Sequence, residues 1–426
     1  MIAGLRAVGS NPTDQIESRK RDTRVCTGEL AVSLAATVAC FARERGAMAG
    51  ASPSARAEVV VPPEWAAATA TAAAASSEPA PPVVVVCGPK NAGKSTFSRL
   101  LLNSLLPRYG RVGYLDTDVG QPEFSPPGCL SFHVVDEALT DLLNPTLREC
   151  ERCCFFGDIS SKRDPETYLN CLFHLYDYFV EKYRSGASEP LPLIVNTPGW
   201  VKGAGFDMLV EMLRYICPTI VVQIRISAQS KNLPDGMFWL DCGQTGPNMI
   251  NIDAPFHDAL NRSLLIQKDS YGMRERRLIE YFKQCFPSDI SLTTNKELAY
   301  GLTSLPPYEV SISDVMVIHL HCQVPPSEVW HSLNATIVGL AISCGTIEAG
   351  RSIPWCAGLG IIRGIDVQRG ILYVITPVPL EHLQRVDLLL QGLIEIPKSL
   401  LQVRGCVSPY MPTNVLHRIS ERDINT

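Results

Sequence analysis

The chain has 426 residues, of which 46% are hydrophobic and 19% are charged, and its formal net charge is −5 at pH 7. This composition excludes a disordered or fibrous protein, and the acidic balance excludes a protein coated in basic charge, although a local basic groove for nucleic acid stays possible. The longest early apolar run, ELAVSLAATVACFA (Glu29–Ala42), is too short to span a membrane and begins with an acid. We therefore predict no transmembrane helix and no membrane partner.

Fifteen cysteines are spread over the chain without a secretory leader, which favours reduced thiols over a disulfide framework. The one tight group, ECERCC, contains Cys150, Cys153 and Cys154. A zinc site needs a second pair of Cys or His at a matching spacing, and the sequence offers none. We therefore expect free thiols here rather than zinc.

The first 82 residues contain a basic patch, SRKRDTR (Ser18–Arg24), and a low-complexity tract, WAAATATAAAASSEPAPP (Trp65–Pro82). The basic patch is more often a solvated charge run than a targeting or nucleic-acid-binding tail. An Ala/Ser/Pro tract cannot build a core of its own, so it predicts a linker. We expect residues 1–82 to be a low-complexity N-terminal region.

A phosphate-binding motif follows. PPVVVV (Pro81–Val86) predicts a central strand of a parallel sheet, and KSTFSRLLLNSLL (Lys94–Leu106) has apolar residues at helical spacing. Between them, GPKNAGKS satisfies G-x-x-x-x-G-K-[ST] in the strand-to-helix context that a P-loop requires. Backbone N–H groups and the helix N-terminus then bind the phosphates of a nucleoside triphosphate. The nucleotide-binding residues expected from this motif are Gly88, Pro89, Lys90, Asn91, Ala92, Gly93, Lys94, Ser95 and Thr96.

Two acids come next, in RVGYLDTDVGQPEFSPPG (Arg111–Gly128). VGYL predicts a second strand that delivers Asp116 and Asp118 at its C-terminal end, where α/β sheets bind ligands. Two residues apart on one strand, both carboxylates share a face, so both can point at one Mg²⁺–phosphate centre. Alone, such a pair more often consists of solvated turn residues. One helix after a P-loop, the functional interpretation is favoured.

A third strand, LPLIV, is followed by NTPGW within Pro190–Trp200. Triphosphate-hydrolysing switches commonly have Asp-x-x-Gly here, but this chain has Asn196 in place of the acid and keeps Gly199. The only candidate for a guanine-reading Asn-Lys-x-Asp, NKEL at Asn295–Leu298, ends wrongly. Both observations weaken a hydrolytic switch. An indole at Trp200, beside the γ-phosphate site, offers a stacking face for a base. The local sequence favours this role and that of a core tryptophan about equally.

Arginines crowd the start of a predicted helix in SLLIQKDSYGMRERRLIEYFKQCF (Ser263–Phe286). Arg274, Arg276 and Arg277 form either a solvated face or a lid that neutralises charge during phosphoryl transfer. The pattern alone favours the solvated face.

Strands alternate with helices until about Phe286, which predicts an α/β domain at residues 83–290, a P-loop NTPase fold with a parallel sheet. After Leu302 the alternation stops, and runs such as DVMVIHLHCQV and NATIVGLAISC are joined by Gly-containing turns. They predict a second, mostly antiparallel β domain at residues 300–426.

In this order, GPKNAGKSTFSR, YLDTDVGQPEFSPPGCLS, NTPGWVKGAG and the Arg-rich helix ending in EYF resemble the polynucleotide 5′-hydroxyl kinases. The tail, with AGLGIIRGID, ILYVITP, VDLLLQGLIEIP and CVSPYM, is similar to their nucleolar branch, which acts on ribosomal RNA precursors. The resemblance implies an enzyme that transfers the γ-phosphate of ATP to 5′-hydroxyl RNA ends with Mg²⁺. It also implies a nuclear, nucleolar location and an endonuclease partner in a pre-rRNA processing complex.

The resemblance assigns roles around the phosphates. It makes Lys94 the phosphate-clamping lysine and Ser95 a ligand of Mg²⁺. Asp116 assists the metal directly or through water. Asp118, the second acid of DTDVGQ, accepts the proton of the 5′-hydroxyl.

The resemblance also assigns residues on the acceptor side. Gln121 lines the acceptor site, and Trp200 becomes a stacking platform for the terminal nucleotide. Arg274, Arg276 and Arg277 become lid residues, with Arg274 and Arg277 the catalytic candidates, so the resemblance reverses the preference for a solvated face. The spacing does not decide which arginine acts.

One departure from the family concerns the N-terminal region. Family members usually have a β-domain in front of the P-loop, whereas only about 80 residues precede it here, so we expect that domain to be reduced or absent. This leaves an alternative function: an ATP-binding assembly factor of an RNA-processing complex with little or no transfer activity.

Overall fold

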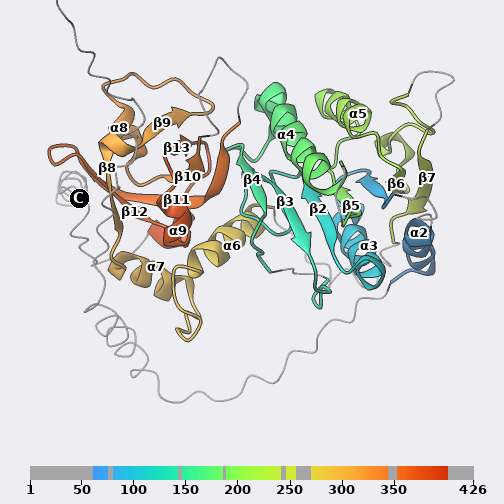
Figure 1. Cartoon of the computed structure of the whole chain (residues 1–426), viewed down its shortest axis with the longest axis horizontal. Coiled ribbons are helices and arrows are strands. Elements are labelled where there is room, and N and C mark those ends of the chain that lie inside the picture. Colours follow the sequence, from blue (N-terminus) through green and yellow to red (C-terminus); the bar gives the residue numbers. More distant parts are fainter. Residues whose placement is uncertain are drawn as a thin grey trace, which may run out of the picture.

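Two β-sheets lie side by side, with helices α6 (Ser270–Lys283) and α7 (Asn295–Ser304) beneath them (Figure 1). The computed structural model describes residues 61–74, 80–142, 146–185, 189–240, 246–255, 270–343 and 353–401. The basic patch, the early apolar run and the CVSPYM stretch considered above lie outside these residues. No helix in the described ranges has the length and apolar content needed to cross a membrane.

Sheet A contains seven strands in the order β4-β3-β2-β5-β1-β6-β7. Strand β1 is central and pairs in parallel with β5 and β6, as expected for an uninterrupted valine run, whereas β3 and β4 form an antiparallel edge. The predicted α/β fold with a parallel-rich sheet is confirmed. The strands are β1 (Val83–Cys87), β2 (Val112–Asp116), β3 (Cys129–Val135), β4 (Arg152–Phe155), β5 (Leu193–Asn196), β6 (Ile220–Arg225) and β7 (Asn248–Asp253).

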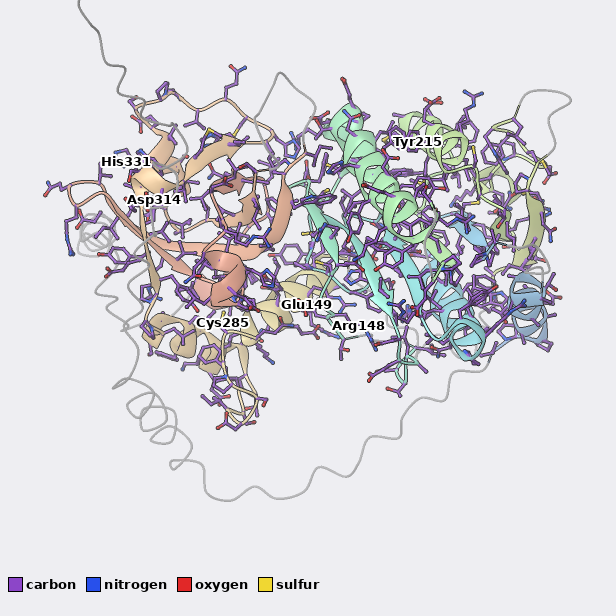
Figure 2. The ribbon with its side chains drawn as sticks, viewed as in Figure 1. Arg148, Glu149, Tyr215, Cys285, Asp314 and His331 are labelled. Atoms are coloured by element: carbon purple, nitrogen blue, oxygen red, sulfur yellow. The ribbon has the colours of Figure 1, made fainter. Side chains whose placement is uncertain are left out.

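Helices cover both faces of sheet A. Alternate residues of β1 face opposite ways, so Val84 packs into one core with α2 (Pro63–Ala74) and α3 (Lys94–Tyr109), while Val85 packs into another with α4 and α5. Helices α4 (Pro165–Tyr183) and α5 (Ala204–Ile216) are tied together where Tyr215, labelled in Figure 2, donates a 2.7 Å hydrogen bond to Asp177. The result is a three-layer α/β/α arrangement.

Helix α2 corrects the linker prediction for the alanine-rich tract. Alanine has the highest helix propensity, but a short helix is stable in a protein only when a side chain packs it onto a core. Trp65 provides that contact. The indole is only 2% exposed, makes an edge-to-face contact with Phe97 of α3, and donates from Nε1 to the carbonyl oxygen of Asp253 at 2.9 Å. The part of the tract from Trp65 to Ala74 is therefore part of the α/β core, not a linker.

Sheet B contains six strands in the order β8-β12-β11-β10-β13-β9. Its pairings are antiparallel except for β13 with β9, so the predicted, mostly antiparallel second sheet is confirmed. The strands are β8 (Tyr308–Ser311), β9 (Met316–His319), β10 (Ile337–Ile342), β11 (Trp355–Asp366), β12 (Ile371–Ile375) and β13 (Leu388–Gln391); the remaining helices are α6 (Ser270–Lys283), α7 (Asn295–Ser304), α8 (Val329–Leu333), α9 (Leu380–Leu383) and α10 (Lys398–Leu401). The domain extents of 83–290 and 300–426 stay predictions.

A shared apolar core joins the two sheets. Phe155 of β4 packs with Ala341 of β10 and with Phe282 of α6, all of them buried. At the same junction, the backbone N–H of Leu393 donates to the carbonyl oxygen of Gly157 at 2.6 Å. Helix α6 is thereby fixed against both sheets, and this places Arg277 beside the loop that follows β2.

The role of α2 is testable by deleting its anchor. Trp65→Ala removes a buried indole and its hydrogen bond, so we expect the free energy of unfolding to fall by about 3–5 kcal/mol. Urea denaturation followed by circular dichroism measures it. Thr71→Ala, on the exposed side of the same helix, is the matched control and should be nearly neutral. Equal effects of the two changes would show that α2 does not depend on its tryptophan.

Candidate active site

The P-loop lies between β1 and α3, where the sequence motif predicts it. Three of its residues have positive φ angles: Gly88 (142°), Asn91 (63°) and Gly93 (93°). A Cβ atom on Gly93 would lie 2.6 Å from the ring of Trp65, so only glycine allows the loop to approach α2 this closely. All nine predicted nucleotide-binding residues are in this loop or in the first turn of α3.

Lys94 is buried at the start of α3, with its Nζ atom donating to the carbonyl oxygen of Pro89 at 2.8 Å. Burial lowers the pKa of Lys94 to about 8, although the nearby carboxylate of Asp118 acts in the opposite direction. A desolvated ammonium inside a loop of backbone N–H groups is a strong site for an anion. The arrangement therefore suits the phosphates of a nucleotide.

The two acids do not share a strand face, which corrects the prediction from their spacing. Strand β2 ends at Asp116, and Asp118 lies in the following loop. Between them, the hydroxyl of Thr117 donates to the carbonyl oxygen of Asn196 at 2.8 Å, and the chain turns after Asp118, at Val119 and Gly120. The Asp116 side chain, at the end of the strand, is fully buried, whereas Asp118, in the loop, is partly exposed. The structure thus gives the two carboxylates separate environments.

Different contacts hold the two carboxylates. Asp116 accepts hydrogen bonds from the backbone N–H groups of Glu123 and Asp118, and burial together with the Glu123 charge raises its pKa to about 8. Asp118 accepts from the N–H groups of Gly120 (3.0 Å) and Gln121 (3.1 Å). Burial raises the pKa of Asp118, and the charge of Lys94 opposes that effect. Asp118 is therefore the fixed, partly accessible carboxylate beside the lysine.

Asn196 belongs to the site, although the sequence analysis treated it only as a weakened switch motif. Its Nδ2 atom lies 3.3 Å from Oδ1 of Asp116 and 3.4 Å from Oγ of Ser95. Its Oδ1 atom is buried and has no hydrogen-bond partner among the described residues. Asn196 ends β5, which lies between β1 and β2, and the ends of such strands are where α/β sheets bind ligands. This position is the sequence signal that points to Asn196 as a site residue. The three side chains form one polar group below the P-loop.

Glu123 and Arg99 are further residues that the sequence analysis missed. Glu123 is 6% exposed and pairs with Arg99 of α3 at 3.2 Å. Its carbonyl oxygen accepts a 2.6 Å hydrogen bond from Nη2 of Arg277. Among the described contacts, Arg277 is thus the lid candidate that reaches the acidic loop, whereas no such contact involves Arg274 or Arg276. Arg99 lies in F-S-R after the P-loop, and Glu123 lies in P-E-F after DTDVGQ. Neither stretch has a charge pattern that predicts their ion pair.

Trp200 lies beside the P-loop and also packs on the core. The backbone before it approaches so closely that a Cβ on Gly199 would lie 2.6 Å from the Cα atom of Lys90. The partly buried indole meets Tyr168 edge-to-face at 5.3 Å, and the Tyr168 hydroxyl donates to the carbonyl oxygen of Thr117 at 2.7 Å. Gln121 is partly exposed on the same loop as Asp118. The indole thus packs on the core with part of its surface exposed, and its role as a stacking platform stays a prediction.

The cysteines of ECERCC lie at the antiparallel edge of sheet A. Cys153 and Cys154 are buried in β4, Cys150 is partly exposed before it, and all three are free thiols. Among the residues that the structure places, no three His, Cys, Asp or Glu side chains are grouped so as to hold a metal ion.

Comparison with known proteins decides the family. Residues 88–284 match the family described as "mRNA cleavage and polyadenylation factor CLP1 P-loop", and residues 303–397 match "NOL9-like, C-terminal domain". The chain is 53% identical over 336 residues to polynucleotide 5′-hydroxyl-kinase NOL9 of Arabidopsis thaliana, covering 78% of this chain and 90% of that protein. The chain belongs to the NOL9 and Grc3 family of polynucleotide 5′-hydroxyl kinases. The family expected from the motifs is confirmed, and with it a nucleotide-binding P-loop domain.

More distant relatives define how far this similarity extends. The chain is 30% identical over 380 residues to human NOL9, which covers 77% of this chain but 52% of that protein. It is 40% identical over 147 residues to grc3 of Schizosaccharomyces pombe, covering 32% of this chain and 19% of that protein. A solved structure of Clp1p with Pcf11p superposes with a TM-score of 0.53 at 17% identity, covering 76% of this chain and 78% of that one, and supports the fold.

The buried Asp116 leads to a pH-dependent stability prediction. Because its folded-state pKa of about 8 is above the unfolded value of 3.8, ionisation costs stability increasingly as the pH rises from about 4 to 8. Asp116→Asn cannot ionise, so we expect the ligand-free variant to melt a few degrees above the wild type at pH 8 and level with it at pH 4. Thermal denaturation at both pH values measures this. A variant that is less stable at pH 8 would contradict the assignment.

Proposed function

We propose that this protein transfers the γ-phosphate of ATP to the 5′-hydroxyl of an RNA end. The observation that supports this most directly is the position of Asp118, a partly exposed carboxylate that interacts with the P-loop lysine, Lys94. A base beside the phosphate-binding loop fits transfer to a hydroxyl acceptor. Assignment of the chain to its kinase family gives independent support.

The side chains have separate tasks in this reaction. The two backbone N–H groups on Asp118 fix the direction of its carboxylate, which accepts the proton of the attacking 5′-hydroxyl. Lys94 exchanges its bond to the Pro89 carbonyl for the phosphate oxygens and stabilises their negative charge. Arg277 adds a second cation from the opposite side, above the loop that contains Glu123. The spread of cations suits a transition state with charge on all the transferred oxygens.

A magnesium ion fits the polar group below the P-loop. The hydroxyl of Ser95 and the carboxylate of Asp116 are oxygen ligands of the kind that Mg²⁺ prefers, and the unpartnered Oδ1 atom of Asn196 suits a water in the ion's shell. Such a site needs few protein carboxylates because nucleotide phosphates and waters complete it. When bound, the ion neutralises phosphate charge.

The biological setting follows from the family and is proposed with the activity. We infer that the acceptors are 5′-hydroxyl ends made during ribosomal RNA precursor processing in the nucleolus. An endonuclease that leaves such ends is the expected partner, because its product is this enzyme's substrate. The chain spans about half the length of the human relative, so these statements concern the part of that protein which it matches.

One assay separates transfer from an assembly role. Incubating the protein with γ-labelled ATP, Mg²⁺ and a 5′-hydroxyl RNA oligonucleotide should give labelled RNA. The same oligonucleotide with a 5′-phosphate is the control and should stay unlabelled. ATP binding without labelled RNA would favour the ATP-binding assembly factor and remove the kinase proposal.

The proposed base gives the sharpest test of mechanism. Asp118→Asn keeps the shape but cannot accept a proton, so we expect turnover to fall by about 100-fold or more with ATP affinity largely retained. Since burial raises the pKa of Asp118, the wild-type rate should increase with pH to a plateau above the ordinary carboxylate range of about 4. This rise should be absent in the variant. An unchanged turnover number would move the base to another residue.

The stacking role of Trp200 is tested by comparing two substrates. Trp200→Ala should raise the apparent KM for the oligonucleotide by about tenfold or more, because base stacking on an aromatic ring contributes about 1–3 kcal/mol. The KM for ATP should change little. Trp200→Phe keeps a ring against Tyr168 and should recover part of the loss. Equal losses for both substrates at fixed salt would identify a purely structural tryptophan.

A further inference from the structure

A polar cleft of about 540 Å³ lies between the two sheets, outside the site described above. One wall comes from the short helix and loop before α4, and the other from the end of β9 and the segment that follows it. Its lining residues are Arg163, Asp164, His319, Leu320, His321, Cys322 and Gln323. None of them has a role in the phosphoryl transfer proposed above.

A row of aromatic rings connects this cleft to the proposed acceptor platform. Trp200 contacts Tyr168 at 5.3 Å, Tyr168 contacts Phe156 at 5.9 Å, and Phe156 contacts His321 at 4.9 Å, each distance joining two ring centroids. All three contacts are edge-to-face, a favourable aromatic geometry. Three ring-to-ring contacts therefore separate the indole of Trp200 from the cleft. A few nucleotides of single-stranded RNA can cover this distance.

A backbone contact ties the same wall to the catalytic loop. A Cβ atom on Gly120, two residues after the proposed base, would lie 2.9 Å from the carbonyl oxygen of Ile159. In that neighbouring segment, the carboxylate of Asp158 accepts a 2.7 Å charge-assisted hydrogen bond from Nε of Arg163. Arg163 is thus positioned by a segment that packs directly on the acceptor loop.

The groups in the cleft suit a ribonucleotide strand. The Arg163 side chain is 56% exposed, and with Nε engaged its terminal nitrogens have no other hydrogen-bond partner among the described residues. Guanidinium nitrogens are common ligands of backbone phosphates. Across the cleft, Nε2 of His321 donates to the carbonyl oxygen of Phe156 at 2.7 Å, because a carbonyl can only accept. In the neutral ring, Nδ1 is then an acceptor, which is what a ribose 2′-hydroxyl requires.

The acid in the cleft does not cancel this preference. Asp164 is the N-cap of α4, and its carboxylate already accepts a 3.0 Å hydrogen bond from the N–H of Thr167. The positive end of the dipole of a 19-residue helix lies at the same point and favours a phosphate. Gln323, exposed at the rim, adds both a donor and an acceptor.

We propose that this cleft binds the acceptor RNA downstream of its 5′-terminal nucleotide, with Arg163 contacting a phosphate and His321 a ribose hydroxyl. The proposal rests on the proposed function, since it takes the strand to leave the active site past Trp200. A dinucleotide occupies the active site without reaching Arg163, whereas a decanucleotide fills both. Substrate length therefore isolates the cleft.

Arg163→Gln tests the phosphate contact. Binding of a 3′-fluorescein-labelled 5′-hydroxyl RNA decanucleotide, followed by fluorescence anisotropy, should weaken by about tenfold at low salt. The slope of log affinity against log salt should become shallower by about 0.7, the value for one phosphate contact on a single strand. The kcat/KM should fall in parallel for the decanucleotide and stay unchanged for the dinucleotide. Arg163→Lys, which keeps the charge, should recover most of the salt slope.

Matched controls distinguish a binding role from a structural one. Lys296→Gln removes one exposed positive charge on α7, away from the cleft, and should leave the salt slope unaltered. A loss shared by the dinucleotide, or an unaltered slope in Arg163→Gln, would overturn the cleft proposal. Absence of RNA binding by the wild type would do the same. RNA binding with an Arg163-dependent slope but no phosphate transfer would instead keep the cleft and remove the kinase proposal.

The ribose contact has its own test. His321→Phe keeps a ring against Phe156 but has no acceptor nitrogen, so we expect a several-fold loss in the preference for the RNA decanucleotide over the DNA decanucleotide of the same sequence. The melting temperature of the variant shows whether the contact between the sheets survives. An unchanged preference in a folded variant would exclude the ribose contact.

Discussion

The close packing of the P-loop backbone is the constraint on which the rest of the site depends. From below, the ring of Trp65 approaches the loop so closely that Gly93 has no room for a side chain. From above, the backbone at Gly199 meets Lys90 in the same way. Because both contacts are backbone to ring or backbone to backbone, the loop has little freedom to relax, and its N–H groups are arranged before any nucleotide arrives.

This packing also determines where the chemistry can occur. The contact at Gly199 places Trp200 at the edge of the P-loop, and the end of β2 separates a buried carboxylate from a partly exposed one. Asp116 and Asp118 are two residues apart, yet one is held among neutral and anionic groups while the other lies beside Lys94. Two acids in different environments can take two different roles, one toward a metal ion and one toward a proton.

The second sheet contributes more than an apolar support. Its core with α6 places Arg277 over the acidic loop, and its β9 edge supplies His321 to the cleft beside the acceptor path. The two sheets are also joined where Gly157 accepts a hydrogen bond from the N–H of Leu393. Relative movement of the two sheets would therefore shift Arg277, the proposed lid residue, and the proposed RNA path together.

The sequence by itself determined the elements whose signal is local. A valine run, a glycine-spaced loop and a helix in immediate succession specify the strand, phosphate site and helix, since each is set by the backbone preferences of neighbouring residues. The same holds for the alternation of strands and turns that predicted sheet B. The sequence also predicted the family, because four short motifs that occur in a fixed order are specific as a set.

Only the tertiary structure decided which of the singled-out residues meet. Spacing placed both acids on one strand face, but β2 ends at Asp116, and Asp118 lies in the loop, where the N–H groups of Gly120 and Gln121 hold its carboxylate. The alanine-rich tract was judged unable to form a core, yet one tryptophan, packed on residues more than thirty positions away, makes it a helix. The pairing of Arg277 with the acidic loop depends on a core that two sheets share. Contacts between residues far apart in the chain have no periodicity or spacing that a sequence can display, so the fold alone reveals them.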